Sequence, residues 1–315
     1  MAILKERFKL GFNIFLYLSL AFLAYYLYKQ NYLAIPQEFN PNWMVFSLTA
    51  LFIGFVVNAI QWVPLLKSQG LAITYKDSIR TFGMAVFGKY IPGKVWVHIG
   101  KSAQIAHTYK YPLAKVSEIS FFSQILSLWV GAIAALIVLV SIGQYDLMFW
   151  TFLSFVMVSG LTISTKRIQN LASALIYRIL KKKFTFSSLK MTDFLNVLPL
   201  YFTSIFSYSV GFLFLAKSLG ATDLASIGMF IFPLAMSIGV VAIIVPGGLG
   251  VREVVIATIL GSMMVSVDSS NTIAVASRLW FLLGEIFIFL LGLYFQSRWK
   301  SNDKANAIVG ENVAS

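Results

Sequence analysis

Apolar segments long enough to cross a membrane follow one another along almost the whole chain. Of the 315 residues, 58% are hydrophobic and only 12% are charged, whereas a soluble domain carries about 25% charged residues. Hydrocarbon offers the backbone no hydrogen-bond partners, so an apolar run of about 20 residues folds as a helix that satisfies its own N–H and C=O groups. The sequence therefore predicts an all-α polytopic membrane protein.

Eight segments have the length and composition of a spanning helix. They are Phe12–Tyr28, Trp43–Leu66, Val116–Ile142, Leu147–Thr165, Phe194–Ala216, Leu224–Val245, Val251–Val267 and Ile273–Gln296. The segment Ile79–Ile99 is also apolar, but lysines and a Pro-Gly pair interrupt it, so we expect a re-entrant hairpin there. The expected organisation is one membrane domain over residues 1–300, with about eight transmembrane helices, and a polar, disordered tail over residues 301–315.

Basic residues are distributed unevenly between the segments that join these helices. If the N-terminus is cytoplasmic, most of the 25 Lys and Arg residues fall in cytoplasmic segments, chiefly Lys67–Lys115 and Lys166–Lys190. Positive charge favours the cytoplasmic side of a membrane. We therefore expect both termini in the cytoplasm, and the net charge of +13 indicates topology and not nucleic-acid binding.

The first of two Pro-Gly breaks in the apolar pattern is Gly88–Lys94, in which Lys89 and Lys94 flank Pro92-Gly93. Pro and Gly disfavour a helix interior, and broken helices persist at membrane depth where protein or a water-filled cavity surrounds them. Free backbone N–H groups and lysine charges at one point suit an anionic phosphate. The alternative is that the lysines extend to the head-group level, and for nearby Lys101 this is the favoured interpretation.

The second break follows Pro246, with glycine at three of the next four positions. These glycines are Gly247, Gly248 and Gly250. A new helix is expected to open at Val251, with Arg252 and Glu253 in its first turn, where the helix N-terminus adds partial positive charge. The alternative is a tight cytoplasmic hairpin with a solvated ion pair, because turns commonly use Gly and Pro.

The last expected span contains two charged residues, Arg278 and Glu285. A charge inside the bilayer costs several kcal/mol and needs a partner or a function. The two residues are seven positions apart and lie two turns apart on one helix face, so each is expected to reach another helix. Glu118 and Glu253 are possible partners for Arg278, and Arg252 for Glu285. The alternative is that these charges form structural ion pairs without a ligand.

Other polar and aromatic residues on the spans have simpler explanations. Asn58, Gln61 and Gln124 are explained by hydrogen bonds between helices. The tryptophans fall mostly near span ends, as in an aromatic belt. We therefore assign these residues no ligand.

Composition excludes several kinds of chemistry. The chain has no cysteine, two histidines and 12 acidic residues, which leaves little material for a metal site. No Walker sequence is present, and no Ser-His-Asp or paired-carboxylate arrangement is evident. We therefore expect no metal, no cofactor and no catalytic residue, and a transporter is favoured over an enzyme.

Two strings and a few single residues carry a family resemblance. They are Gly88-Lys89-Tyr90-Ile91-Pro92-Gly93-Lys94, Pro246-Gly247-Gly248-Leu249-Gly250-Val251-Arg252-Glu253, Glu118, Arg278-Leu279 and Glu285. Together they resemble the lysylphosphatidylglycerol synthase transmembrane-region family. The resemblance spans roughly residues 10 to 298. In the multiple peptide resistance factors this region moves aminoacylated phosphatidylglycerol between leaflets, and a separate soluble domain makes the lipid. The chain ends at Ser315 without that domain, so the resemblance implies lipid handling and not lipid aminoacylation. It also implies a bacterial or archaeal cytoplasmic membrane.

The function predicted from the sequence is binding and transbilayer movement of an anionic phospholipid or a polyprenyl-phosphate-linked glycan. Two alternatives stay open: a membrane-embedded lipid or glycosyl transferase, and a non-catalytic membrane partner of an envelope glycosyltransferase. The expected lipid-binding residues are Lys89, Pro92, Gly93, Lys94, Glu118, Pro246, Gly247, Gly248, Gly250, Arg252, Glu253, Arg278 and Glu285.

Overall fold

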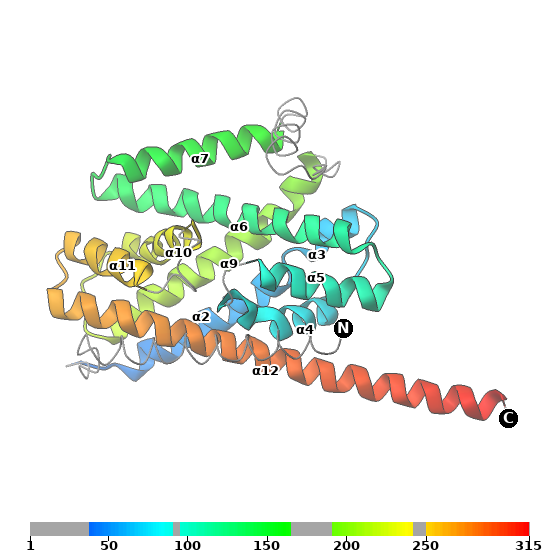
Figure 1. Cartoon of the computed structure of the whole chain (residues 1–315). Coiled ribbons are helices and arrows are strands. Elements are labelled where there is room, and N and C mark those ends of the chain that lie inside the picture. Colours follow the sequence, from blue (N-terminus) through cyan, green and yellow to red (C-terminus); the bar gives the residue numbers. More distant parts are fainter. Residues whose placement is uncertain (1–37, 91–94, 165–190, 242–249, 315) are drawn as a thin grey trace, which may run out of the picture.

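The computed structural model describes the backbone of residues 38–90, 95–164, 191–241 and 250–314 (Figure 1). Side chains are described for residues 38–90, 95–161, 192–240 and 250–299. Within these ranges the regular elements are all helical. They are α2 (Pro41–Ile60), α3 (Val63–Ser68), α4 (Tyr75–Ala85), η1 (Val86–Tyr90), α5 (Trp96–Tyr109), α6 (Leu113–Ser141), α7 (Leu147–Ser164), α9 (Met191–Ser218), η2 (Ser226–Phe230), α10 (Ile231–Val241), α11 (Val251–Ser262) and α12 (Val267–Ala314).

Four helical segments in the described part of the chain are long and apolar enough to cross a membrane. They are Pro41–Ser68, Leu113–Ser141, Thr192–Ser218 and Val267–Trp299. The all-α membrane class is thus shown, but the count of eight spans is not confirmed. The expected spans Leu147–Thr165 and Leu224–Val245 correspond to shorter apolar helices, Leu147–Leu161 and Ser226–Val240. The expected span Phe12–Tyr28 lies outside the described residues.

Helix α11 also differs from the expected span Val251–Val267, because it ends at Ser262. A helix of 12 residues extends about 18 Å at about 1.5 Å per residue, which is well short of the roughly 30 Å of a hydrocarbon core. The helix α12, by contrast, continues to Ala314, through the segment for which polar composition predicts a tail. The membrane domain therefore combines long helices with short ones.

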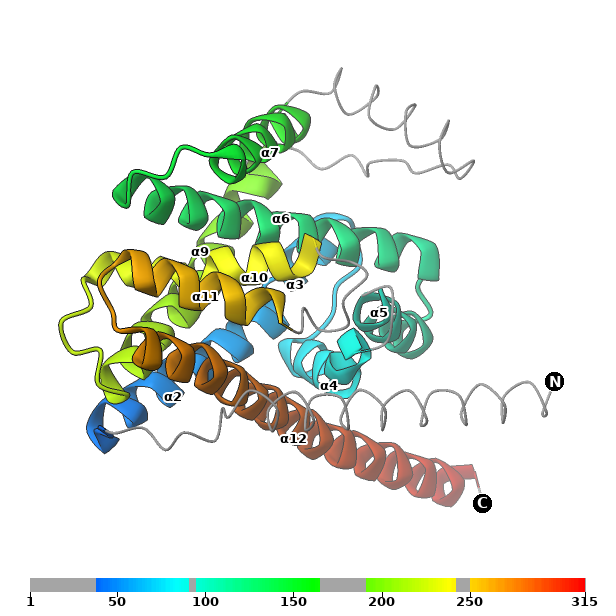
Figure 2. The same cartoon turned by 60° about the vertical axis from the view of Figure 1, so that its left-hand side comes forward.

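The short helices form two hairpins that lie between α6 and α12 (Figures 1 and 2). In the first hairpin, α4 packs against α12 and α5 packs against α6. In the second hairpin, α11 packs against α12 and α10 packs against α6. Each hairpin contains one of the two Pro-Gly breaks. The helices α4 and α5 in and after the expected re-entrant segment Ile79–Ile99 pack against each other, but a re-entrant hairpin in a membrane is not confirmed and stays a prediction.

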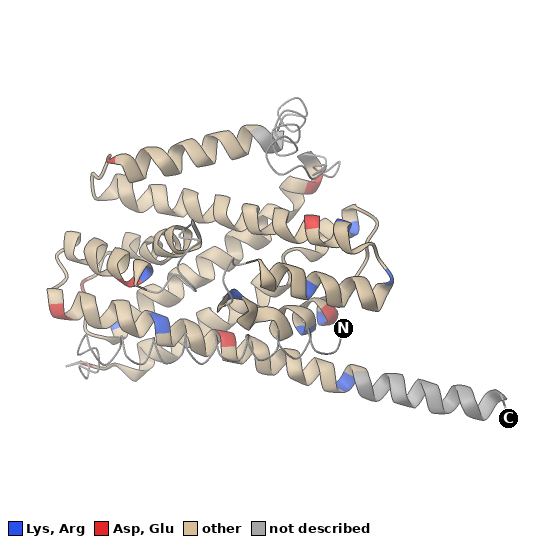
Figure 3. Ribbon diagram, in the orientation of Figure 1, with Lys and Arg blue, Asp and Glu red and all other residues tan. Residues whose placement is uncertain are grey.

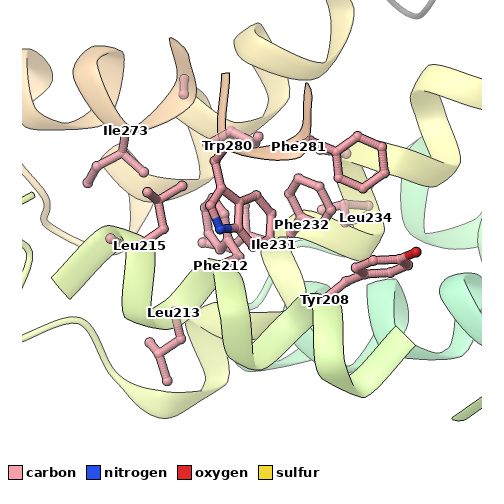
Figure 4. Close-up of a cluster of buried hydrophobic side chains, with 14 of the residues drawn as sticks. Tyr208, Phe212, Leu213, Leu215, Ile231, Phe232, Leu234, Ile273, Trp280 and Phe281 are labelled. Atoms are coloured by element: carbon pink, nitrogen blue, oxygen red, sulfur yellow. The ribbon is translucent and has the colours of Figure 1, made fainter. Parts of the chain in front are cut away.

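The apolar core joins the second hairpin to α2, α9 and α12. Figure 4 shows side chains from α9, α10 and α12 in one buried cluster. The Phe232 ring lies 5.6 Å from Phe212, 5.2 Å from Trp280 and 5.5 Å from Phe281, between ring centroids. Tryptophans were expected near span ends, but Trp280 and Trp62 are fully buried; Trp280 belongs to this core and Trp62 to a second buried cluster.

The first hairpin contacts α12 through a close backbone crossing. A Cβ atom on Gly83 of α4 would lie 2.3 Å from the carbonyl oxygen of Ile288 and 3.0 Å from the Cα atom of Gly292. Only residues without a side chain allow this approach. The crossing places the end of α4 against the middle of α12, where Glu285 lies. Figure 3 shows that most of the ribbon carries no charge, so the few charges within the bundle stand out.

Candidate functional site

The first hairpin brings a lysine and a tyrosine to a buried carboxylate. The chain leaves α4 at Ala85 and continues as the short helix η1, whose last residues are Lys89 and Tyr90. Lys89 forms an ion pair with Glu285 of α12, and the Tyr90 hydroxyl donates a hydrogen bond of 2.8 Å to the other oxygen of that carboxylate. Only 1% of Glu285 is exposed. The expected partner of Glu285 was Arg252, and the structure gives Lys89 instead. The reason is that η1 directly follows α4, and the packing of α4 against α12 places η1 next to Glu285.

The second hairpin places an arginine and a glutamate at the start of α11. Gly250 precedes the helix with φ of +81°, a left-handed conformation that glycine adopts without strain. The helix begins at Val251, which confirms that expectation. Arg252 and Glu253 in its first turn are both buried, so the alternative of a solvated ion pair is wrong. Their backbone N–H groups belong to the helix N-terminus, where partial positive charge favours anions.

Arg278 of α12 forms the second buried ion pair. Its Nη1 atom donates to Oε1 of Glu253 over 3.0 Å, so one of the two partners expected for Arg278 is confirmed. The other candidate, Glu118, is half-buried near the start of α6 and does not line the cavity described next. Both intramembrane charges of α12 thus pair with hairpin residues, one with each hairpin.

A cavity of about 530 Å³ lies between the two hairpins. Lys89 and Lys101 line it from the first hairpin, Arg252 from the second, and Arg278 and Glu285 from α12. Among the described residues, four cationic side chains therefore face this space against one lining carboxylate. Pockets of this size hold small ligands, and convergent polar groups fix their orientation. Residues that the sequence placed at separate breaks contribute to one cavity.

Aromatic rings support the cationic side chains of the cavity. The guanidinium carbon of Arg252 lies 5.3 Å from the ring centroid of Phe232 and 5.1 Å from that of Phe281. The Nζ atom of Lys89 lies 4.7 Å from the same Phe281 centroid. A cation within about 6 Å of an aromatic face is attracted by the ring quadrupole. Phe281 therefore contacts a cation from each hairpin.

Another part of the cavity lining is polar and hydrogen-bonded. The amide nitrogen of Gln61 donates to Asn58 over 3.1 Å and to Ser127 over 2.9 Å, and the Ser204 hydroxyl donates to the Gln61 carbonyl over 2.9 Å. Asn58 in turn donates to the Tyr208 hydroxyl over 3.1 Å. The predicted role of Asn58 and Gln61 in bonds between helices is confirmed. The sequence did not indicate that they also line a cavity.

Lys101 is the functional candidate that the sequence analysis did not select. It lies on α5, is only 4% exposed and faces the cavity, so the interpretation as a head-group lysine is wrong. Its Nζ atom is 4.0 Å from the Trp62 ring centroid. In the sequence, Lys101 lies about two helical turns after the break, but this position does not show that its side chain faces the interior.

Six expected site residues lie outside the described residues. They are Pro92, Gly93, Lys94, Pro246, Gly247 and Gly248. The structure thus brings together Lys89, Arg252, Arg278 and Glu285 at the cavity, with Glu253 bonded to Arg278. In the described ranges, no group of three His, Cys, Asp or Glu side chains could hold a metal ion.

A separate polar cluster joins α4, α5 and α12 away from the cavity. Arg80 pairs with Asp77 over 3.1 Å and donates to Gln296 over 2.9 Å. The Tyr109 hydroxyl donates to Asp77 over 2.6 Å. Burial raises the pKa of Asp77, but the bonds from Tyr109 and Thr74 and the charge of Arg80 outweigh it and hold this pKa below its ordinary value. The Thr74-x-x-Asp77 spacing was the available signal, because it forms a helix cap.

Long apolar helices around a charged interior cavity define a polytopic α-helical membrane protein with an internal polar site. The sequence model of the family described as "Lysylphosphatidylglycerol synthase TM region" matches residues 10–299. The chain therefore belongs to the lysylphosphatidylglycerol synthase transmembrane-region family, as the motifs indicated. Comparisons with curated proteins and with solved structures give no match.

Proposed function

We propose that this protein binds an anionic lipid by its head group in the cavity and moves the head group across the bilayer. The observation that carries the proposal is the charge of the cavity: four cations line it against one carboxylate. Ionisable residues inside a membrane are expensive and mark ligand or ion pathways. Membership of a lipid-handling family supports the same function.

The arrangement of the two hairpins suggests how the head group is held. Arg252 offers a planar fork that suits a phosphate, and the N-terminus of α11 adds backbone donors. The lipid tails stay in the bilayer while the head group occupies the polar interior. Downhill exchange and coupling to an ion gradient are both compatible with this mechanism.

A reconstitution assay tests the proposal. Purified protein is placed in vesicles with a trace of phosphatidylglycerol labelled with a fluorophore on one acyl chain, and external dithionite bleaches the outer leaflet. We expect bleaching to exceed the outer-leaflet fraction only with protein present. Labelled phosphatidylcholine should respond less, because its head group has no net charge. Equal bleaching with and without protein for labelled phosphatidic acid as well as labelled phosphatidylglycerol, under imposed proton and sodium gradients as well, would refute the proposal.

Matched variants connect the transport to the cavity. Arg252→Gln should reduce transfer, because it removes a buried lining cation, whereas Lys76→Gln removes an exposed cation of α4 and should leave transfer unchanged. Equal lipid transfer by the wild type and by Arg252→Gln would show that transfer does not depend on this lining cation of the cavity.

The proposed orientation places both termini in the cytoplasm of a bacterial or archaeal cell, in agreement with the distribution of Lys and Arg. The chain has no cysteine, so single cysteines can be introduced freely. A cysteine at position 182 should be protected from an impermeant thiol reagent in intact cells. Labelling there would overturn the orientation.

A further inference from the structure

The four lining cations of the cavity divide into two that have carboxylate partners and two that have none. Lys89 pairs with Glu285 and Arg278 pairs with Glu253. Arg252 and Lys101 appear in none of the ion pairs among the described residues. The Lys89–Glu285 pair joins the first hairpin to α12, and the Glu253–Arg278 pair joins the second hairpin to α12. The two unpaired cations come one from each hairpin.

Arg252 is buried with incomplete partners. Its side chain is 7% exposed, it faces the cavity, and its Nε atom has no hydrogen-bond partner. The rings of Phe232 and Phe281 stabilise the cation without satisfying its N–H donors. A buried donor without an acceptor destabilises the protein by its uncompensated desolvation, and more so when the group is charged. An anion in the cavity removes that cost.

Lys101 has a similar environment on the other hairpin. The ammonium group lies over the Trp62 ring and 5.9 Å from the centroid of Phe82. No carboxylate of the described residues lies within ion-pair distance of it. A buried charge is costly unless it is paired, and a ring face replaces a counter-ion only in part.

The two breaks themselves cannot supply the missing negative charge. Residues 91–94 read Ile-Pro-Gly-Lys and residues 242–249 read Ala-Ile-Ile-Val-Pro-Gly-Gly-Leu, so neither contains Asp or Glu. Neither break therefore supplies a carboxylate for Arg252 or Lys101, whereas an anionic ligand in the cavity would supply negative charge to both.

Resting on the proposed function, we infer that the head group taken by this cavity carries two negative charges, as a phosphate monoester does, and that Arg252 and Lys101, the two lining cations without a carboxylate partner among the described residues, balance this charge. A phosphate monoester has a charge of about −1.5 to −2 at pH 7, which matches two unpaired cations. A phosphodiester such as phosphatidylglycerol has a single negative charge. A head group with an added lysyl cation meets a cavity that already has an excess of positive charge.

Native mass spectrometry of the purified full chain, titrated with single lipids, tests this inference. The probes are phosphatidic acid and a polyprenyl phosphate (both monoesters), phosphatidylglycerol (a diester), lysylphosphatidylglycerol (cationic) and phosphatidylcholine. We expect both monoesters to bind about tenfold or more tightly than phosphatidylglycerol, and lysylphosphatidylglycerol to bind no better than phosphatidylcholine. Tight binding of one monoester alone would assign the tail, glycerolipid or prenyl.

Three variants assign the site. Lys101→Gln should abolish the preference for monoesters over phosphatidylglycerol, Lys101→Arg should retain it, and Lys76→Gln on the exposed face of α4 should leave it unchanged. Equal affinity of the wild type for monoester and diester would overturn the inference while leaving anionic-lipid binding intact. Equal affinity for phosphatidylglycerol and phosphatidylcholine, without any monoester preference, would defeat both proposals. The wild-type comparison decides the matter even if a variant fails to fold.

Discussion

Each hairpin packs one helix against α6 and the other against α12, but different interactions stabilise the two hairpins. The first hairpin, α4–η1–α5, is held by the Gly83 crossing and by the polar cluster of Asp77, Arg80 and Tyr109. The second hairpin, α10–α11, is held by the aromatic core around Phe232. One wall of the cavity therefore depends on hydrogen bonds and close backbone packing, while the other depends on apolar burial.

The largest expected effect concerns the ion pair of the second hairpin. Glu253→Gln leaves Arg278 buried without its partner, so we expect a loss of about 3–5 kcal/mol in the free energy of unfolding. Lys89→Gln in the first hairpin should cost less, because the Lys89 side chain is 27% exposed and Glu285 keeps the hydrogen bond from Tyr90. Reversible unfolding in mixed detergent micelles measures both.

The Glu253→Gln/Arg278→Gln double variant controls for this interpretation. Two residues in contact show non-additive effects of about 0.5–3 kcal/mol, so the double variant should be less damaged than the sum of the single variants. Strict additivity of the two single variants would show that Glu253 and Arg278 do not stabilise the fold as a pair. Equal losses in the free energy of unfolding for Glu253→Gln and Lys89→Gln would show that the deeper burial of the Glu253–Arg278 pair does not increase its contribution to stability.

The next effect concerns the backbone crossing of the first hairpin. Gly83→Ala introduces a Cβ atom that would lie 2.3 Å from a backbone oxygen of α12, and we expect a loss of about 1–3 kcal/mol in the free energy of unfolding. Gly261→Ala is the matched change in the second hairpin, where no atom lies within 4 Å of the added group. It should be neutral or stabilising by up to about 1 kcal/mol. Similar losses from both substitutions would remove the distinction between the hairpins.

A smaller effect is expected from a change that keeps the charge of the cavity. Arg252→Lys preserves the cation and loses the planar fork, so lipid transfer should fall by about tenfold, with Arg252→Gln lower still. The vesicle assay above measures this, with protein amounts matched by immunoblot. Full activity of Arg252→Lys would mean that Arg252 acts as a point charge.

The smallest effect concerns pH and the first hairpin alone. The lowered pKa of Asp77 means that its contribution to stability is present above the ordinary pKa of the carboxyl and is lost as pH falls through the lowered value. Tyr109→Phe removes a hydrogen-bond donor to Asp77, so it should cost about 1 kcal/mol or less at this partly exposed site and move acid sensitivity to higher pH. Hydrogen exchange of α4 amides between pH 3 and pH 7 measures the change. If the amides of α10 and α11 showed the same pH dependence of hydrogen exchange, acid sensitivity would not be a property of the first hairpin alone.

Much of the candidate site was predictable from sequence because charge in an apolar chain has few explanations. Lys89, Arg252, Arg278 and Glu285 were selected for that reason, and the structure brings them to one cavity. Lys101 was misjudged, because sequence position does not show which way a helix face points. The partner of Glu285 was also missed, since a contact across 196 positions depends on the packing of α4 against α12.

The sequence by itself determined the class of the protein, the family and the places where its helices break. These follow from composition, charge distribution and Pro-Gly chemistry, which act locally along the chain. Only the tertiary structure decided that α10 and α11 are short, that residues beside two distant breaks line one cavity, and which of its cations lack a carboxylate partner among the described residues. The physical reason is that apolar segments look alike in sequence whether they face lipid or protein, so their pairing is decided by the packing of side chains in space.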